Sequence, residues 1–201
     1  MKYFSKKMWL GLQDEKSSKL WEQKWRQNSQ LYINSLRKLR GVISARNYSF
    51  FVSGHQHGDY LLSITLINKG KTYRQKETGE LHVREITKPV DVEILTLCPT
   101  GRILVLKYTN ARDVFFDFPS NNPLWFNDSK GFGSWGYDEI SLAKNKFLVH
   151  EILFDSGATI KIKFEKFSYL SRKSKSKGAR HDFRGQVEPR ESKRKRKDQV
   201  T

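Results

Sequence analysis

Residues 159–167 read Thr-Ile-Lys-Ile-Lys-Phe-Glu-Lys-Phe, a run in which apolar and charged side chains alternate. Because successive side chains of a β-strand point to opposite faces, this run predicts a strand with one dry face and one solvated face. Strands of this kind are typical of antiparallel sheets that cover a core with one face only. The C-terminal part of the folded region is therefore expected to be antiparallel β-structure.

Similar segments precede this one along most of the chain. They are separated by groups of turn-forming residues, such as Cys98-Pro99-Thr100-Gly101 and residues 155–157 (Asp-Ser-Gly). The composition of these segments, rich in β-branched and aromatic residues, indicates strands. We expect them at about residues 60–67, 71–76, 81–86, 90–97, 103–108, 114–118, 137–142 and 147–154.

The first forty residues have helical rather than strand spacing. Ser5 can cap a helix that ends near Gln13, and a second helix is expected from about Ser18 to Arg40. Its apolar side chains recur at steps of three and four, which places them on one side of the helix. They are Leu20, Trp21, Trp25, Tyr32, Leu36 and Leu39. Gly41 can adopt the left-handed conformation that ends a helix, and from there the spacing changes to alternation.

These patterns predict an α+β fold, with two N-terminal helices packed on a meandering antiparallel sheet or a partly closed barrel. Residues 1–40 supply the helices and residues 41–170 the sheet, and together they form one domain. Residues 171–201 contain mainly Lys, Arg and Ser with few apolar side chains, so we expect a disordered basic tail. No internal repeat is visible.

Charge is distributed unevenly along the 201 residues. Of the net charge of +17, residues 1–40 carry +7, residues 41–170 only +2 and the tail +8. The excess therefore lies at the two ends, where it favours salt-dependent contact with a polyanion; a solubilising tail without a partner is the alternative. The candidate polyanion-binding residues are Arg172, Lys173, Lys175, Lys193, Arg194, Lys195, Arg196 and Lys197.

Compartment is predicted from features that the sequence lacks. Cys98 is the single cysteine, so no internal disulfide framework is expected. Lysines interrupt the apolar residues of the first ten positions, unlike in a signal peptide. No run approaches the roughly 20 apolar residues that a membrane-spanning helix needs. We therefore expect a cytoplasmic protein without membrane insertion.

A metal site is the first chemical possibility to weigh. His55, His57 and Asp59 alternate in sequence, so on a strand their side chains could converge on one ion. No HExxH, CxxC or similar ligand spacing accompanies them. A loop with a locally hydrogen-bonded histidine is the simpler interpretation, and no metal or other cofactor is expected.

Several carboxylates are candidates for a hydrolase. On a strand, Asp138 and Glu139 point to opposite faces and cannot act together on one substrate. Asp138 then lies on the apolar face, either at a solvent-accessible edge or as a carboxylate with a perturbed pKa. The other candidates are Asp117, Glu151 and Asp155. No GxSxG motif, Walker A loop or motif-placed Cys–His pair is present, so no catalytic residue is assigned.

Residues 115–137 contain eight aromatic side chains interleaved with glycines. Aromatics on such a loop could stack on bases or contact a partner protein. They could also fold back as a lid on the sheet, which we favour because large aromatics supply much of a core. The candidate interaction surface comprises Trp125, Phe126, Phe132 and Trp135.

Several short motifs resemble an uncharacterised bacterial family of cytoplasmic proteins of about this size. They are residues 1–6 (MKYFSK), the segment His57-Gly58-Asp59 before an apolar strand, and residues 135–140 (WGYDEI) ahead of the strand with His150. The resemblance covers residues 1–170 and implies fold and compartment, but no activity. The family has an adjacent His-Asp pair where Gly58 intervenes here, and it has no basic tail.

Together the sequence favours a non-enzymatic binding or interaction module with an unidentified protein partner, in which the tail adds affinity for an anionic partner. A nucleic-acid-associated protein is the alternative, with aromatic residues stacking on bases. The third possibility is a small hydrolase, metal-dependent or carboxylate-based.

Overall fold

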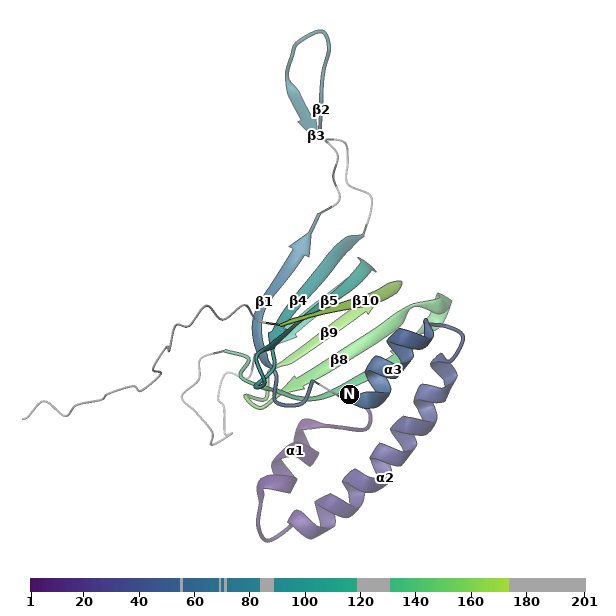
Figure 1. Cartoon of the computed structure of the whole chain (residues 1–201), viewed down its shortest axis with the longest axis vertical. Helices are drawn as coiled ribbons and strands as arrows, with labels where there is room; N and C mark the ends of the chain where they lie inside the picture. Colours follow the sequence, from purple (N-terminus) through teal and green to yellow (C-terminus); the bar gives the residue numbers. More distant parts are fainter. Residues whose placement is uncertain (55, 69, 71, 84–88, 119–130, 174–201) are drawn as a thin grey trace, which may run out of the picture.

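A computed structural model describes residues 1–54, 56–68, 70, 72–83, 89–118 and 131–173. This part of the chain contains three α-helices and two antiparallel sheets of four strands each (Figure 1). The predicted α+β class is confirmed. The described strands form these two sheets and a separate two-stranded hairpin rather than one meander, and they do not close into a barrel.

Apart from the helix Ala45–Ser53 and the strand Lys166–Lys173, the helices and strands follow the predicted order. The helices are α1 (Lys6–Gln13), α2 (Ser18–Leu36) and α3 (Ala45–Ser53), with short 3₁₀ helices at Arg37–Leu39 and Lys144–Lys146. The strands are β1 (Tyr60–Ile67), β2 (Thr72–Arg74), β3 (Leu81–Val83), β4 (Val90–Leu97), β5 (Arg102–Ala111), β6 (Asp113–Asp117), β7 (Trp135–Leu142), β8 (Leu148–Phe154), β9 (Thr159–Phe164) and β10 (Lys166–Lys173).

Two bent strands connect the sheets. The first sheet has the order β1-β4-β5-β10 and the second the order β6-β9-β8-β7. β5 continues into β6 and β9 into β10, so one antiparallel pair runs through both sheets. Hydrogen bonds persist at the bend: the Arg112 N–H donates to the Lys163 carbonyl at 2.8 Å, and the Glu165 N–H donates to the Thr109 carbonyl at 3.1 Å.

The last strand is longer than predicted. Glu165 and Lys166 are two consecutive polar residues that break the alternation, and the strand bends there before continuing as β10 to Lys173. Arg172 pairs with Ile103 in the register of β5. Residues 171–173 therefore belong to the sheet, and their assignment to the tail is wrong, because charged side chains are tolerated at an exposed sheet edge. The rest of the predicted tail lies outside the described residues.

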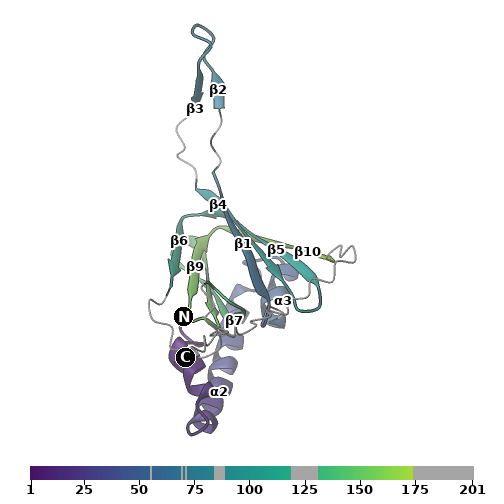
Figure 2. The same cartoon turned by 90° about the vertical axis from the view of Figure 1, so that its left-hand side faces the viewer.

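The core lies between the two sheets. Figure 2 shows them from the side, with β6 and β9 in one layer and β1, β5 and β10 in the other. Removal of the apolar inner faces from water is the main stabilising contribution to such an arrangement. The fully buried side chains include Val92, Ile94, Leu106, Tyr108, Ile152, Ile160, Ile162 and Phe164.

The two N-terminal helices agree closely with those predicted from the sequence. Ser5 caps α1 by accepting a hydrogen bond from the Met8 N–H at 3.3 Å, as predicted. α2 ends at Leu36, earlier than expected, and one 3₁₀ turn leads to Gly41 with φ +81°. α2 lies beside the edge strand β7, where the Ile140 N–H donates to the Tyr32 hydroxyl at 2.9 Å. This contact satisfies a backbone donor that an edge strand leaves unpaired.

The third helix was not predicted. Residues 45–53 were expected to follow the alternating pattern of strands, and this is wrong. The Ser44 hydroxyl accepts the Asn47 N–H at 3.3 Å, and Gly54 with φ +59° ends the helix. Phe50 and Phe51 are buried against the β10 residue Phe167. A serine cap followed ten residues later by glycine was the signal available in the sequence.

The aromatic stretch contributes to the core. The Trp135 side chain is 1% exposed and packs edge-on against Phe154. Phe132 also contacts Phe154, from the neighbouring loop. Trp135 therefore cannot form part of an interaction surface, and this assignment is wrong; the lid interpretation fits both residues. Trp125 and Phe126 lie outside the described residues.

The β2–β3 hairpin lies apart from the two sheets (Figure 1).

Among the described residues, no helix has the length and apolar character required to cross a membrane.

Candidate ligand-binding site

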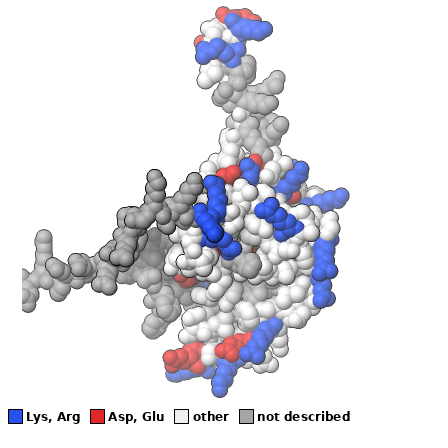
Figure 3. Space-filling model, in the orientation of Figure 1, with Lys and Arg blue, Asp and Glu red and all other residues white. Residues whose placement is uncertain are grey.

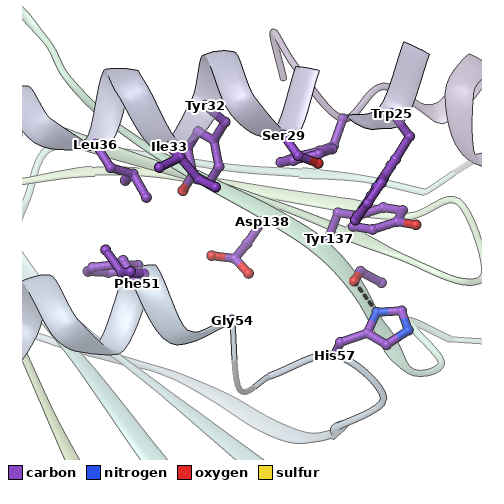
Figure 4. Close-up of a pocket in the computed structure, with 13 residues that line it drawn as sticks. Trp25, Ser29, Tyr32, Ile33, Leu36, Phe51, Gly54, His57, Tyr137 and Asp138 are labelled. Atoms are coloured by element: carbon purple, nitrogen blue, oxygen red, sulfur yellow. Dashed lines mark hydrogen bonds between the residues drawn. The ribbon is translucent and has the colours of Figure 1, made fainter. Parts of the chain in front are cut away.

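A cavity of about 400 Å³ lies between α2, the C-terminal end of α3 and β7 (Figure 4). Concave sites of this size, with mostly apolar walls and a few polar groups, are typical of small-molecule binding. The residues that line it are Phe4, Trp25, Ser29, Tyr32, Ile33, Leu36, Phe51, Val52, Gly54, His57, Gly136, Tyr137 and Asp138.

One side of α2 forms a wall of the cavity. Trp25, Ser29, Tyr32, Ile33 and Leu36 follow one another at steps of one, three and four, so they share a helix face. The deeper members, Tyr32 and Leu36, are buried, as the apolar spacing of this helix predicted.

Apolar side chains surround the mouth of the cavity. Trp25, Ile33 and Val52 line it and yet are 36%, 44% and 48% exposed. Exposed apolar side chains gathered at a cavity mark a surface that a ligand can cover. We therefore place the opening between α2 and the end of α3.

The N-terminal segment completes the wall because Glu139 holds it. This buried carboxylate accepts hydrogen bonds from the backbone N–H groups of Lys2, Tyr3 and Phe4, at 2.7, 2.6 and 2.6 Å. Phe4 is thereby stacked on the ring of Tyr137, with centroids 5.3 Å apart. Glu139, a candidate hydrolase residue, thus positions the chain and faces away from Asp138, as the alternation predicted.

Glu151 also contacts the N-terminal segment, through the amino group of Met1. Its carboxylate lies 3.0 Å from the Met1 amino group and 3.3 Å from the Lys161 ammonium. Burial alone would raise the pKa of this carboxyl, but the two positive charges outweigh it and lower the pKa. Glu151 therefore acts as a structural ion pair on the outer face of β8.

Asp138 faces the cavity from β7, on the inner side of the sheet (Figure 4). Its Oδ1 accepts a hydrogen bond from the Trp135 indole N–H at 3.1 Å, and its Oδ2 lies 3.0 Å from His150 Nε2. The side chain is 14% exposed. The sequence predicted that Asp138 lies on the apolar face of its strand. Solvent reaches this side chain through the cavity at the edge of the sheet.

Behind Asp138, a chain of hydrogen bonds crosses the core. His150 Nδ1 lies 2.8 Å from the Tyr108 hydroxyl, and both side chains are fully buried. Tyr108 comes from β5 in the first sheet, whereas His150 and Asp138 belong to the second. The Asp138–His150–Tyr108 network therefore links the two sheets to the cavity.

The hydrogen bonds assign the protons in this network. Burial, followed by the nearby negative charge of Asp138, raises the pKa of Tyr108 well above its ordinary value, so the phenol keeps its proton. The Tyr108 O–H then donates to His150 Nδ1, and His150 Nε2–H donates to Asp138. In this arrangement each proton of the network has an acceptor, and the Asp138 carboxylate accepts from both His150 and Trp135.

Among the described residues, neither Lys nor Arg lies within ion-pair distance of Asp138. The same negative charge, after burial, raises the pKa of Tyr32 across the cavity. The site thus combines one carboxylate charge with aromatic walls.

His57 and Asp59, the weak metal candidates, make separate contacts. His57 lines the cavity, with Nδ1 2.6 Å from the Gly136 carbonyl, so this nitrogen donates. Asp59 accepts a hydrogen bond from the Thr96 hydroxyl at 3.0 Å, and burial raises its pKa. No three His, Cys, Asp or Glu side chains cluster as metal ligands in the described part of the chain. His55 lies outside it.

The remaining candidates lie elsewhere. Asp155 accepts the Ser134 N–H at 2.8 Å and so fixes a turn, and Asp117 is exposed on β6. Arg172 and Lys173 are exposed at the end of β10. The other polyanion candidates, from residue 175 onward, lie outside the described residues.

Sequence reasoning missed most of the cavity. Trp25 and Tyr32 were assigned to a packing stripe, and Tyr108 and His150 to ordinary strand positions. The available signal was Asp138 on an apolar strand face, because a carboxylate there needs buried hydrogen-bond partners. Its partners, Trp135 and His150, come from β7 and the neighbouring strand β8, so their identity depends on how these strands pair.

Comparison with known proteins yields no match to a family model, a curated protein or a solved structure. The resemblance to an uncharacterised bacterial family stays a prediction.

Proposed function

We propose that the protein is a non-enzymatic binding module for a small organic ligand, which occupies the cavity between α2, α3 and β7. The observation that carries this proposal is the cavity itself: about 400 Å³, aromatic walls and a single carboxylate. Its exposed apolar mouth supports the proposal independently, since a ligand would cover Trp25, Ile33 and Val52.

Binding accounts for the site better than catalysis does. A histidine that acts as general base needs a free ring nitrogen within reach of its substrate, but both ring nitrogens of His150 are engaged inside the protein. Ser29 Oγ is buried at the cavity, and among the described residues it has no hydrogen-bond partner. A serine nucleophile requires an adjacent base, so Ser29 is better suited to contact a ligand.

The test uses two tryptophan substitutions on α2. Ile33→Trp enlarges a side chain at the mouth, whereas Leu31→Trp is the matched control, exposed on the same helix but not lining the cavity. Binding of 2-phenylethylamine, 2-phenylethanol and phenylacetate is measured by saturation-transfer NMR and calorimetry. These probes share an aromatic body and differ in the head group.

We expect at least one probe to bind the native protein and Leu31→Trp equally, and to bind Ile33→Trp about tenfold more weakly. The proposal is wrong if none of the three binds, or if Ile33→Trp binds them as the native protein does.

A second proposal concerns the basic C-terminal residues, which would bind an anionic partner such as nucleic acid. The run Lys193–Lys197 places five cations in succession, and exposed Arg172 and Lys173 precede it. On the described face shown in Figure 3, Lys and Arg side chains are scattered among uncharged residues and do not gather in one patch. Such contacts depend on phosphate charge rather than base sequence, so they weaken steeply with salt.

A further inference from the structure

Asp138 brings a carboxylate to the wall of the cavity. Its described partners are the buried side chains of His150 and Trp135. None of the described residues that line the cavity is Lys or Arg. A carboxylate in a largely apolar site is costly unless a positive charge or further donors compensate it. The cavity therefore favours a ligand that brings its own positive charge.

Aromatic side chains line the cavity around this carboxylate. Figure 4 shows Asp138 directed into the space between Tyr32, Phe51 and Tyr137, with Trp25 beside Tyr137. The faces of aromatic rings carry negative potential and attract cations, and a carboxylate strengthens this attraction. The same combination repels anions.

The site also offers free hydrogen-bond acceptors. Each oxygen of Asp138 accepts one described hydrogen bond, whereas a carboxylate oxygen has room for two. Ser29 Oγ lies at the cavity and is unpartnered within the described structure. An ammonium group donates up to three hydrogen bonds, so it can use the free positions on Asp138.

From the carboxylate, the lack of Lys and Arg among the described lining residues, the aromatic walls and the unused acceptors together, we infer that the ligand is an organic cation, an ammonium group on an apolar body. This inference rests on the proposed function of the cavity. The ammonium lies against Asp138, and the apolar body extends between Trp25 and Ile33 towards the mouth.

The experiment compares head groups and charge. Affinities for 2-phenylethylammonium, 2-phenylethanol and phenylacetate are measured by calorimetry with the native full-length chain, Asp138→Asn and Asp117→Asn. Asp117→Asn is the matched control, because it removes the same charge from an exposed position on β6. Binding of the neutral alcohol to Asp138→Asn reports whether the variant still folds around the cavity.

We expect the ammonium compound to bind the native protein and Asp117→Asn about tenfold or more tightly than the alcohol, and phenylacetate to bind most weakly. In Asp138→Asn the preference for ammonium disappears while the alcohol still binds. Equal native affinity for the alcohol or the carboxylate would overturn the cation inference and leave the cavity proposal intact. If Asp138→Asn keeps the native preference for ammonium, Asp138 is not the recognition group and the inference fails. If none of the three compounds binds, both the cation inference and the proposed function of the cavity are overturned.

Discussion

Replacement of Glu139 by alanine is expected to release the N-terminal segment from β7. The native carboxylate accepts three backbone N–H groups at 2.6–2.7 Å, within a buried site. A hydrogen bond to a charged group contributes about 1.5–3 kcal/mol net, and the three share one carboxylate. We therefore expect Glu139→Ala to lower the free energy of unfolding by about 3–5 kcal/mol.

A glutamine at position 139 gives an intermediate result. Its amide oxygen can still accept from Tyr3 and Phe4, which share Oε1, but its NH₂ group would meet the Lys2 N–H. One hydrogen bond to the carboxylate is lost, and the other two become bonds to a neutral amide oxygen. We therefore expect the free energy of unfolding to fall by about 2 kcal/mol. Because Phe4 lines the cavity, both variants should also weaken ligand binding.

Urea unfolding, followed by fluorescence and circular dichroism, measures these losses. Ser141→Ala is the matched control, since Ser141 is exposed on the same face of β7, and we expect a change within about 0.5 kcal/mol. If the free energy of unfolding of Glu139→Ala lies within about 1 kcal/mol of the native value, the carboxylate does not hold the N-terminal segment and the reasoning is refuted.

Three further predictions test the core and the basic residues. Tyr108→Phe leaves His150 Nδ1 without its donor and should lower the free energy of unfolding by about 1–3 kcal/mol, whereas an unchanged urea midpoint would exclude the assigned hydrogen bond. Burial raises the pKa of Asp59, so its ionisation opposes folding; as pH rises from about 4 to 7, Asp59→Asn should gain stability relative to the native protein, and parallel pH profiles would contradict this. The full chain should bind mixed-sequence DNA and RNA in a salt-sensitive way, and a chain that ends at Lys173 should lose this binding; equal binding by both chains at physiological salt would place recognition in the folded domain.

Alternating side chains made most strands predictable. β1 and β4 begin and end where the sequence places them, because each is bounded by turn-forming residues. α3 was missed because nine residues contain only two and a half turns, too few to establish a helical period among so many aromatic side chains. The bend at Glu165 was visible as a break in the alternation, but its consequence, a strand shared by two sheets, depends on pairing between distant segments.

The cavity was less predictable than the fold. Asp138 could be assigned to the inner face of its strand from the alternation alone. Its contact with His150 follows from the register of β7 and β8, in which Ile140 lies opposite His150. Tyr108 comes from the other sheet, so its contact with His150 arises only when the sheets pack. Local sequence spacing carries no information on that step.

The most direct test of the account is the response of the Trp135 indole N–H to an organic cation. This group donates to Asp138, so its ¹⁵N–¹H resonance reports on what reaches the carboxylate. We expect 2-phenylethylammonium to shift the resonances of Trp135 and of Trp25 at the mouth with one saturating curve, and Asp138→Asn to abolish the response. If both indole resonances stay unchanged at concentrations where calorimetry detects binding, the cation binds elsewhere and the assignment of this cavity is wrong.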